Sequence, residues 1–156
     1  MSARRTDNHR NAGFSLIELL TVIMLFSIAT SIGVGAVGQA MERGAVRGAN
    51  RTFATVHARA RSHAVQNGVQ VKFIADADVD SLWVSAGDSV ITAISLVDDL
   101  GVDLQSSPAR VQICMNARGL SDRLCNSFQA PVDLRFTKGD KTSRTRVRTF
   151  GTLTPL

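Results

Sequence analysis

Charged side chains are nearly absent from the front of this chain. Between Phe14 and Gly38 the only one is Glu18. At about 1.5 Å of rise per residue, a helix of that length is long enough to cross a hydrocarbon layer of roughly 30 Å. The core helix of a small domain is rarely apolar on every side over such a distance. The pattern therefore favours a membrane-spanning helix over a buried core helix.

Patterns typical of catalysis and metal binding are also missing. His57 and His63 lie six residues apart, whereas a helical metal site needs a spacing of four. The two cysteines have no further ligands at suitable spacing. The sequence holds no nucleophile elbow, phosphate loop or paired-carboxylate pattern, and no internal repeat. We therefore expect a protein that is not an enzyme and that uses neither a metal nor another cofactor.

The residues before the apolar run are polar and mostly basic. Three arginines and one aspartate stand there: Arg4, Arg5, Arg10 and Asp7. Such a basic head is expected to stay on the cytoplasmic side of a membrane. A secretory signal peptide also begins this way, but it ends in a small-residue cleavage site after the apolar run. The small residues after this run form no A-x-A pattern, and the conspicuous glycine, Gly13, precedes it.

The segment Gly13-Phe14-Ser-Leu-Ile-Glu18-Leu-Leu20 resembles the leader junction of type IV pilins and pseudopilins. In that family a prepilin peptidase, which is also a methyltransferase, cuts after the glycine and N-methylates the next residue. The resemblance implies cleavage between Gly13 and Phe14, methylation of Phe14, and other pilin or pseudopilin subunits as partners. It also implies a single pass through the inner membrane, a periplasmic C-terminal domain, and later residence in a pilus or pseudopilus fibre.

The rest of the chain resembles the GspH/FimT branch of that family, which contains minor pilins and minor type II secretion pseudopilins. The similarity lies in a helix with Ala-Arg pairs, the Arg110–Gly119 segment, and a C-terminal strand that ends near Gly151. It implies a leader at 1–13, a transmembrane and assembly helix at 14–38, and a globular pilin domain at 39–156 with the lollipop shape of a pilin.

The position of Glu18 has a physical explanation if cleavage follows Gly13. The cut gives Phe14 a cationic amine, and Glu18 lies four residues on, hence on the same helix face. The first turn of a helix also favours a carboxylate. An unpaired Glu in lipid would be costly. We expect Glu18 to pair with its own amine or with a neighbouring subunit's amine during assembly; the alternative is a merely tolerated carboxylate at the interface.

The hydrophobic pattern predicts an α+β fold. A helix from about Phe14 to Gln66 is expected to end at Asn67-Gly68, a plausible C-terminal cap. In its second part, 39–67, the apolar positions recur every three or four residues at Val46, Ala49, Phe53, Val56, Ala60 and Ala64. This face should pack on a mostly antiparallel sheet of five to seven strands within 68–156. The strands are predicted at Val69–Ile74, Leu82–Val84, Val90–Val97, Val111–Met115, Val132–Thr137 and Arg144–Phe150, with a hairpin turn at Lys138–Lys141.

Cys114 and Cys125 are the only cysteines. In a domain exported to an oxidising compartment, an even pair indicates a disulfide, which here would close a loop of about a dozen residues. Two free buried thiols are the alternative.

Charge is unevenly distributed along the globular part. Between Lys72 and Arg110 there is no Lys or Arg, but there are seven acids: Asp76, Asp78, Asp80, Asp88, Asp98, Asp99 and Asp103. The first three of these resemble the start of a calcium loop. The loop's glycine is replaced by Ser81 and its final acid by Gly87, so an acidic turn is favoured.

A basic cluster lies near the C-terminus and makes DNA a candidate partner. It contains Lys138, Lys141, Arg144, Arg146 and Arg148, and the three arginines alternate along a predicted strand. Such a ridge can neutralise phosphates, as in a FimT-like minor pilin for DNA uptake. The Arg-x-Arg part of the Gly-Arg-x-Arg signature of DNA-binding members is present, but its glycine is not. For the ridge, the alternative is a strand that is solvated or that faces another subunit. For the whole chain, the alternative is a signal-anchored periplasmic protein that never polymerises.

Overall fold

The computed structural model describes residues 14–156, without the side chains of residues 31–34. The predicted leader, 1–13, and Gly13 with it, lies outside the described residues. The chain divides between Gly38 and Gln39 into two units, and each is described separately here. A single helix, α1 (Leu16–Asn67), crosses the division.

The first unit consists of the apolar part of α1. Its large hydrophobic side chains from Phe14 to Val37 are exposed wherever they are described. One stretch of α1 is long and apolar enough to cross a membrane by length and composition, with a mean hydropathy of 2.1 and none of its window buried. This unit therefore has no interior of its own in the described part of the chain.

The remainder of α1 is amphipathic, as its spacing predicts. All six of the expected inward positions are buried: Val46, Ala49, Phe53, Val56, Ala60 and Ala64. The helix ends at Asn67, and Gly68 follows with a φ of +64°, a left-handed conformation that glycine adopts at little cost. The N–H of Val69 then donates to the carbonyl of Ala64 at 3.2 Å, which closes the helix end.

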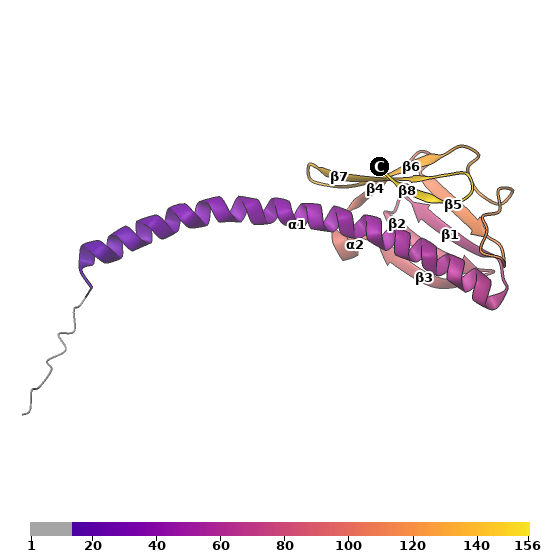
Figure 1. The fold of residues 1–156 in the computed structure, drawn as a ribbon, viewed down its shortest axis with the longest axis horizontal. Coiled ribbons are helices and arrows are strands. Elements are labelled where there is room, and N and C mark those ends of the chain that lie inside the picture. The colour runs from indigo at the N-terminus through magenta and orange to yellow at the C-terminus, as the bar shows by residue number, and fades with distance from the viewer. Residues whose placement is uncertain (1–13) are drawn as a thin grey trace, which may run out of the picture. The chain divides into compact units, whose positions relative to one another are not determined.

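Two four-stranded antiparallel sheets make up the β structure (Figure 1). Sheet A has the order β3-β2-β1-β5, and sheet B has the order β4-β6-β7-β8. The strands of sheet A are β1 (Val71–Asp76), β2 (Ser81–Ala86), β3 (Ser89–Ser95) and β5 (Arg110–Met115). Those of sheet B are β4 (Asp103–Gln105), β6 (Val132–Lys138), β7 (Lys141–Val147) and β8 (Leu153–Pro155).

The core joins the helix to both sheets at one aromatic cluster. The ring of Phe53 on α1 lies 5.2 Å from that of Phe73 on β1, centroid to centroid, and 5.8 Å from that of Phe136 on β6. All three side chains are fully buried. Aromatic pairs at these distances add stability beyond the area they bury, so Phe53 links the three layers of the second unit.

The α+β class, the long helix and the antiparallel pairing are confirmed, but the strand count is not five to seven. Residues 14–156, which the structure describes, form eight strands in two sheets rather than one. The run Val90–Val97 is a strand only to Ser95, whose hydroxyl caps the short helix α2 (Leu96–Leu100) by accepting from the N–H of Asp98. The strand predicted at Arg144–Phe150 is shifted, because the turn holds only Gly139 and Asp140, so that β7 begins at Lys141 and ends at Val147.

Candidate assembly site and charged surfaces

The predicted assembly residues lie at the start of α1. Phe14 precedes the helix and is 82% exposed. The carbonyl of Ser15 accepts hydrogen bonds from the N–H groups of Glu18 and Leu19, at 3.0 and 3.2 Å, and these bonds form the first turn of the helix. Glu18 is the acidic residue of that turn, where the helix dipole favours negative charge. Its side chain is exposed, as is that of Phe14 four residues before it.

Three hydroxyl side chains of the apolar segment form hydrogen bonds within the helix itself. The hydroxyl of Thr21 donates to the carbonyl of Glu18 at 2.9 Å, and that of Ser27 donates to Ile23 at 2.8 Å. The hydroxyl of Thr30 donates to the carbonyl of Phe26 at 2.6 Å. A hydroxyl bonded to its own helix needs no water, and this suits a helix that is surrounded by lipid or by other helices.

The described residues include no group of three or more His, Cys, Asp or Glu placed to hold a metal ion. Two of the three aspartates that resemble a calcium loop, Asp76 and Asp80, have side-chain contacts within the fold. Asp76 is buried and lies 3.8 Å from the guanidinium of Arg110. A carboxylate oxygen of Asp80 accepts from the N–H of Leu104 and so fastens the β1–β2 turn to β4.

The two cysteines form a disulfide, with Cα atoms 5.7 Å apart. The loop between them is also held by hydrogen bonds. The carbonyl oxygen of the Asn126 side chain accepts from the N–H of Cys114 at 2.9 Å, and its amide donates to the hydroxyl of Ser121 at 2.8 Å. The disulfide is one of several constraints that keep this loop on the edge of sheet A.

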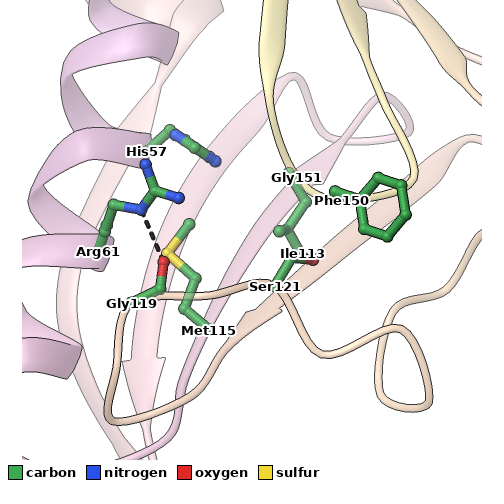
Figure 2. Close-up of a pocket in the computed structure, with 8 residues that line it drawn as sticks. All are labelled: His57, Arg61, Ile113, Met115, Gly119, Ser121, Phe150 and Gly151. Carbon is green, nitrogen blue, oxygen red and sulfur yellow. Dashed lines mark hydrogen bonds between the residues drawn. The ribbon is translucent and has the colours of Figure 1, made fainter.

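Arg61 of α1 holds the same loop from the other side. Its Nε donates to the carbonyl of Gly119 at 2.7 Å, as the dashed line in Figure 2 shows. Gly119 has a φ of +72°, and a Cβ placed there would approach Val65 to 2.8 Å. Glycine is therefore required at this turn, both for its backbone conformation and for the close approach to the helix.

Next to Arg61 lies a buried histidine, His57, with an exposed fraction of 7% (Figure 2). Burial is the main cause that lowers its pKa to about 4, and the positive charge of Arg61 adds to the effect. The Gly151 backbone offsets this shift only in part. His57 is thus neutral at pH 7. The hollow beside it is lined by Ile113, Met115 and Phe150 among others, and it leaves no room for a ligand.

The predicted basic ridge is largely paired within the chain. Arg146 and Asp133 face each other across β7 and β6, with Nε to Oδ1 at 2.6 Å and Nη2 to Oδ2 at 2.8 Å. This hydrogen-bonded pair lowers the pKa of Asp133 and raises that of Arg146. Lys138 donates to the carbonyl of Leu100 at 2.7 Å.

The remaining members of the ridge divide into paired and unpaired cations. Lys141 forms an ion pair with Asp140, and this hydrogen bond lowers the pKa of Asp140. Arg144 on β7 and Arg148 just beyond it are exposed, and their side chains form no ion pair within the described residues. The two-residue turn of the β6–β7 hairpin sets Lys138 opposite Lys141 and hence Asp133 opposite Arg146, so the pair could have been found from the sequence.

Comparisons with known proteins agree with both halves of this description. The family described as the prokaryotic N-terminal methylation motif matches residues 8–34, a range that contains Gly13, Phe14 and Glu18. A crystal structure of the type IV minor pilin FimU from Pseudomonas aeruginosa (strain PAO1) is similar to this chain, with a TM-score of 0.56 and 12% sequence identity. The similarity covers 74% of this chain and 90% of that one. The comparison with curated proteins found no match.

The fold is therefore that of a pilin, and the N-terminal motif is the one that such proteins carry. The chain is therefore similar to type IV pilins in its N-terminal motif and in its fold. The sequence resemblance is confirmed at that level.

Proposed function

We propose that the chain is a minor pilin or minor type II secretion pseudopilin of the GspH/FimT branch. In this proposal a prepilin peptidase removes residues 1–13, and the mature subunit enters a fibre through its N-terminal helix. The observation that carries the proposal is the Gly13–Phe14 junction with Glu18, placed directly before an apolar helix that buries nothing within the described residues. The methylation-motif match and the FimU-like fold support it.

The chemistry of the junction explains why the residues belong together. Before cleavage, Glu18 has no cationic group within the apolar run to balance its charge. Cleavage after Gly13 creates an amine on Phe14, and helix periodicity puts this amine and Glu18 on one face. A buried charge pair in a low-dielectric environment is costly to break, so it can specify the register of one helix against another. The function is structural in this account and involves no catalysis.

The proposal also fixes the membrane topology. The arginines of the leader stay in the cytoplasm, residues 14–38 cross the inner membrane, and residues 39–156 lie in the periplasm. The hydroxyl groups bonded within the helix, from Thr21 to Thr30, suit this placement. The mature chain then leaves the membrane when it joins the fibre.

Mass spectrometry of the mature N-terminus tests the proposal. The chain is co-expressed with a prepilin peptidase, and the same chain without the peptidase is the control. We expect the product to begin at Phe14 and to carry one methyl group on its amine. Gly13→Val is the matched variant, because a branched side chain at the cleaved bond should block processing. An uncut chain, or a cut after Gly38, would exclude the proposal.

Binding of duplex DNA by the basic C-terminal residues is the second candidate. Arg144 and Arg148 support it because their charges are exposed and have no ion-pair partner within the described part of the chain. The pairing of Arg146 with Asp133 weighs against it. A gel-shift titration with the full chain in detergent decides. Salt-sensitive binding that the double change Arg144→Ala and Arg148→Ala abolishes would support this role, and unchanged binding would reject it.

A further inference from the structure

Three arginines form a stripe along the globular part of α1. Arg43, Arg47 and Arg51 follow one another at four-residue spacing, and all are exposed. Like charges at this spacing repel each other and weaken a helix. Arg43 makes one long hydrogen bond, 3.5 Å to the side chain of Gln39. The side chains of Arg47 and Arg51 have no partner within the described residues. None of the three arginines forms an ion pair within the described residues.

The stripe borders a groove between α1 and the β7–β8 side of sheet B. Two adjoining hollows, of about 230 and 280 Å³, form it and share Arg47 and Ser143. Arg43 and Lys141 line the first hollow, and Arg51 and Pro155 line the second. The one acid in the lining of these two hollows is Asp140, which pairs with Lys141. We call this feature the basic groove.

The walls of the basic groove are fixed to each other. The amide of Asn50 on α1 donates to the hydroxyl of Ser143 at 2.7 Å. The hydroxyl of Thr145 on β7 donates to the carbonyl oxygen of the Asn50 side chain at 2.6 Å. Both groups of one amide are thus used to join the helix to the strand. The groove keeps its width, and its arginines project from a preformed surface, which lowers the entropy cost of binding.

The opposite edge of sheet B is acidic. The strand order β4-β6-β7-β8 places β4 at the edge that is remote from the groove. Asp103 on β4 and Asp98 and Asp99 on the adjacent α2 are all exposed. Two cations lie near this edge: Lys138 donates to the carbonyl of Leu100, and Arg135 on β6, opposite Gln105 of β4, is exposed. We call Asp98, Asp99 and Asp103 the acidic edge.

We propose that the basic groove of one copy of the chain receives the acidic edge of a second copy. In the described part of the chain, no residue of the acidic edge and none of Arg43, Arg47 and Arg51 forms an ion pair, and β4 and β8 are opposite edges of sheet B. This is the arrangement of a head-to-tail contact, which can repeat from copy to copy and build an open filament. A nucleic acid would account for the groove but would leave the acidic edge unexplained. The contact rests on the proposed assembly function and extends it to the globular units.

Charge-reversal variants of the full chain in detergent test this contact by sedimentation velocity. The groove variant carries Arg47→Glu and Arg51→Glu, and the edge variant carries Asp98→Lys and Asp99→Lys. Arg59→Glu is the matched control, because Arg59 is exposed on the same helix and does not line the groove. All variants keep the same apolar helix, so association through that helix is common to every sample.

We expect each reversed variant alone to associate at least roughly tenfold more weakly than the wild type, because like charges then meet. Mixing the two variants should restore association, since the reversed groove of one fits the reversed edge of the other. The Arg59 control should behave as the wild type, and about 0.5 M salt should weaken the wild type itself.

Two results would overturn the contact. The first is that the two variants and their mixture associate as the wild type does. The second is that the wild type binds a duplex oligonucleotide through Arg47 and Arg51 while its self-association is insensitive to both reversals. Neither result depends on processing at Gly13, because the assay uses the uncut chain. Failure of the contact and failure of the proposed processing are therefore distinguishable.

Discussion

The two parts of α1 form one continuous helix, but they differ in whether their apolar side chains are buried. From Leu16 to Gly38 the large apolar side chains that the structure describes are all exposed, and none of the apolar window is buried. From Gln39 to Asn67 it has one apolar face, and the six positions of that face are fully covered. Apolar surface gains stability only when it leaves water. The apolar face of the second part is buried within this chain, whereas the apolar side chains of the first part must be buried against something outside it.

The features on which the proposed function rests lie in the apolar part of α1. The globular part is complete in itself, with a core, a disulfide and capped helix ends. The apolar part carries the methylation motif, the single charge of Glu18 and the self-bonded hydroxyls. In the function proposed above, this apolar part is surrounded first by a bilayer and then by neighbouring helices. The difference can be tested by changing each part in turn.

Truncation of one phenylalanine in each part of α1 should give the largest difference between the two parts in the free energy of unfolding. Phe53→Ala removes the ring that contacts Phe73 and Phe136, and should lower the free energy of unfolding of the globular unit by about 3–5 kcal/mol. Phe26→Ala, on the exposed apolar part, should leave it unchanged within about 0.5 kcal/mol. Denaturant unfolding followed by the fluorescence of Trp83, the only tryptophan, measures both. Equal effects of the two changes would contradict the comparison.

Removal of the disulfide should affect only the globular part. The bond closes a loop with a sequence separation of 11. The double change Cys114→Ser and Cys125→Ser should therefore lower the free energy of unfolding by about 3 kcal/mol on the chain-entropy estimate. The same denaturant titration measures it, with the oxidised wild type as reference. Sedimentation of the chain with membranes should not change. Loss of membrane association in the double variant would show that the two parts are not independent.

Acid should destabilise the globular part through His57. Its pKa is about 4 in the folded chain and about 6.5 when unfolded, so the unfolded state takes up the proton first as the pH falls. Stability from this residue is complete above pH 6.5 and declines toward pH 4. Between pH 7 and 4.5 the loss should be about 2–3 kcal/mol.

The variant His57→Leu isolates this contribution. Other groups titrate in the same range, so the informative quantity is the difference between the acid dependences of the wild type and the variant. We expect a shallower loss of stability for His57→Leu between pH 7 and 4.5. Identical slopes would mean that His57 is not held neutral by burial.

Much of the fold could be predicted because its causes are local. The apolar run, the three- and four-residue spacing and the Asn67-Gly68 end define α1 without reference to the rest of the chain. The longer strands follow from alternation and turn residues. The shorter elements could not be predicted, since β4 and β8 have three residues each and α2 has five. Periods of two and 3.6 residues cannot be recognised over so few positions.

The division into two sheets could not be predicted for a different reason. Alternation assigns a residue to a face of a strand, but it does not choose the neighbouring strand. The chain passes from β5 in one sheet to β6 in the other through the disulfide loop and a segment without regular structure. That choice depends on contacts distant in sequence, such as Phe53 against both Phe73 and Phe136.

The N-terminal end of the candidate site was easier to predict from the sequence than the charged surfaces were. The order of Gly13, Phe14 and Glu18 is a local pattern that can be recognised in the sequence without the structure, and the matched range 8–34 contains it. The charged surfaces were less predictable. Arg146 was expected to be available, but its register places it against Asp133. The stripe of Arg43, Arg47 and Arg51 follows from the four-residue spacing of these arginines, but the sequence alone does not reveal the groove beside it.

The central claim is that the apolar part of α1 joins other subunits through Glu18, and the most direct test is incorporation of Glu18→Ala into fibres. The variant and the wild type are expressed in a cell that assembles the fibre, and the sheared fibre fraction is compared with the membrane fraction by immunoblotting. The account predicts that both chains are processed, that the wild type enters the fibre, and that the variant stays in the membrane. Entry of Glu18→Ala into fibres at the wild-type level would contradict the account.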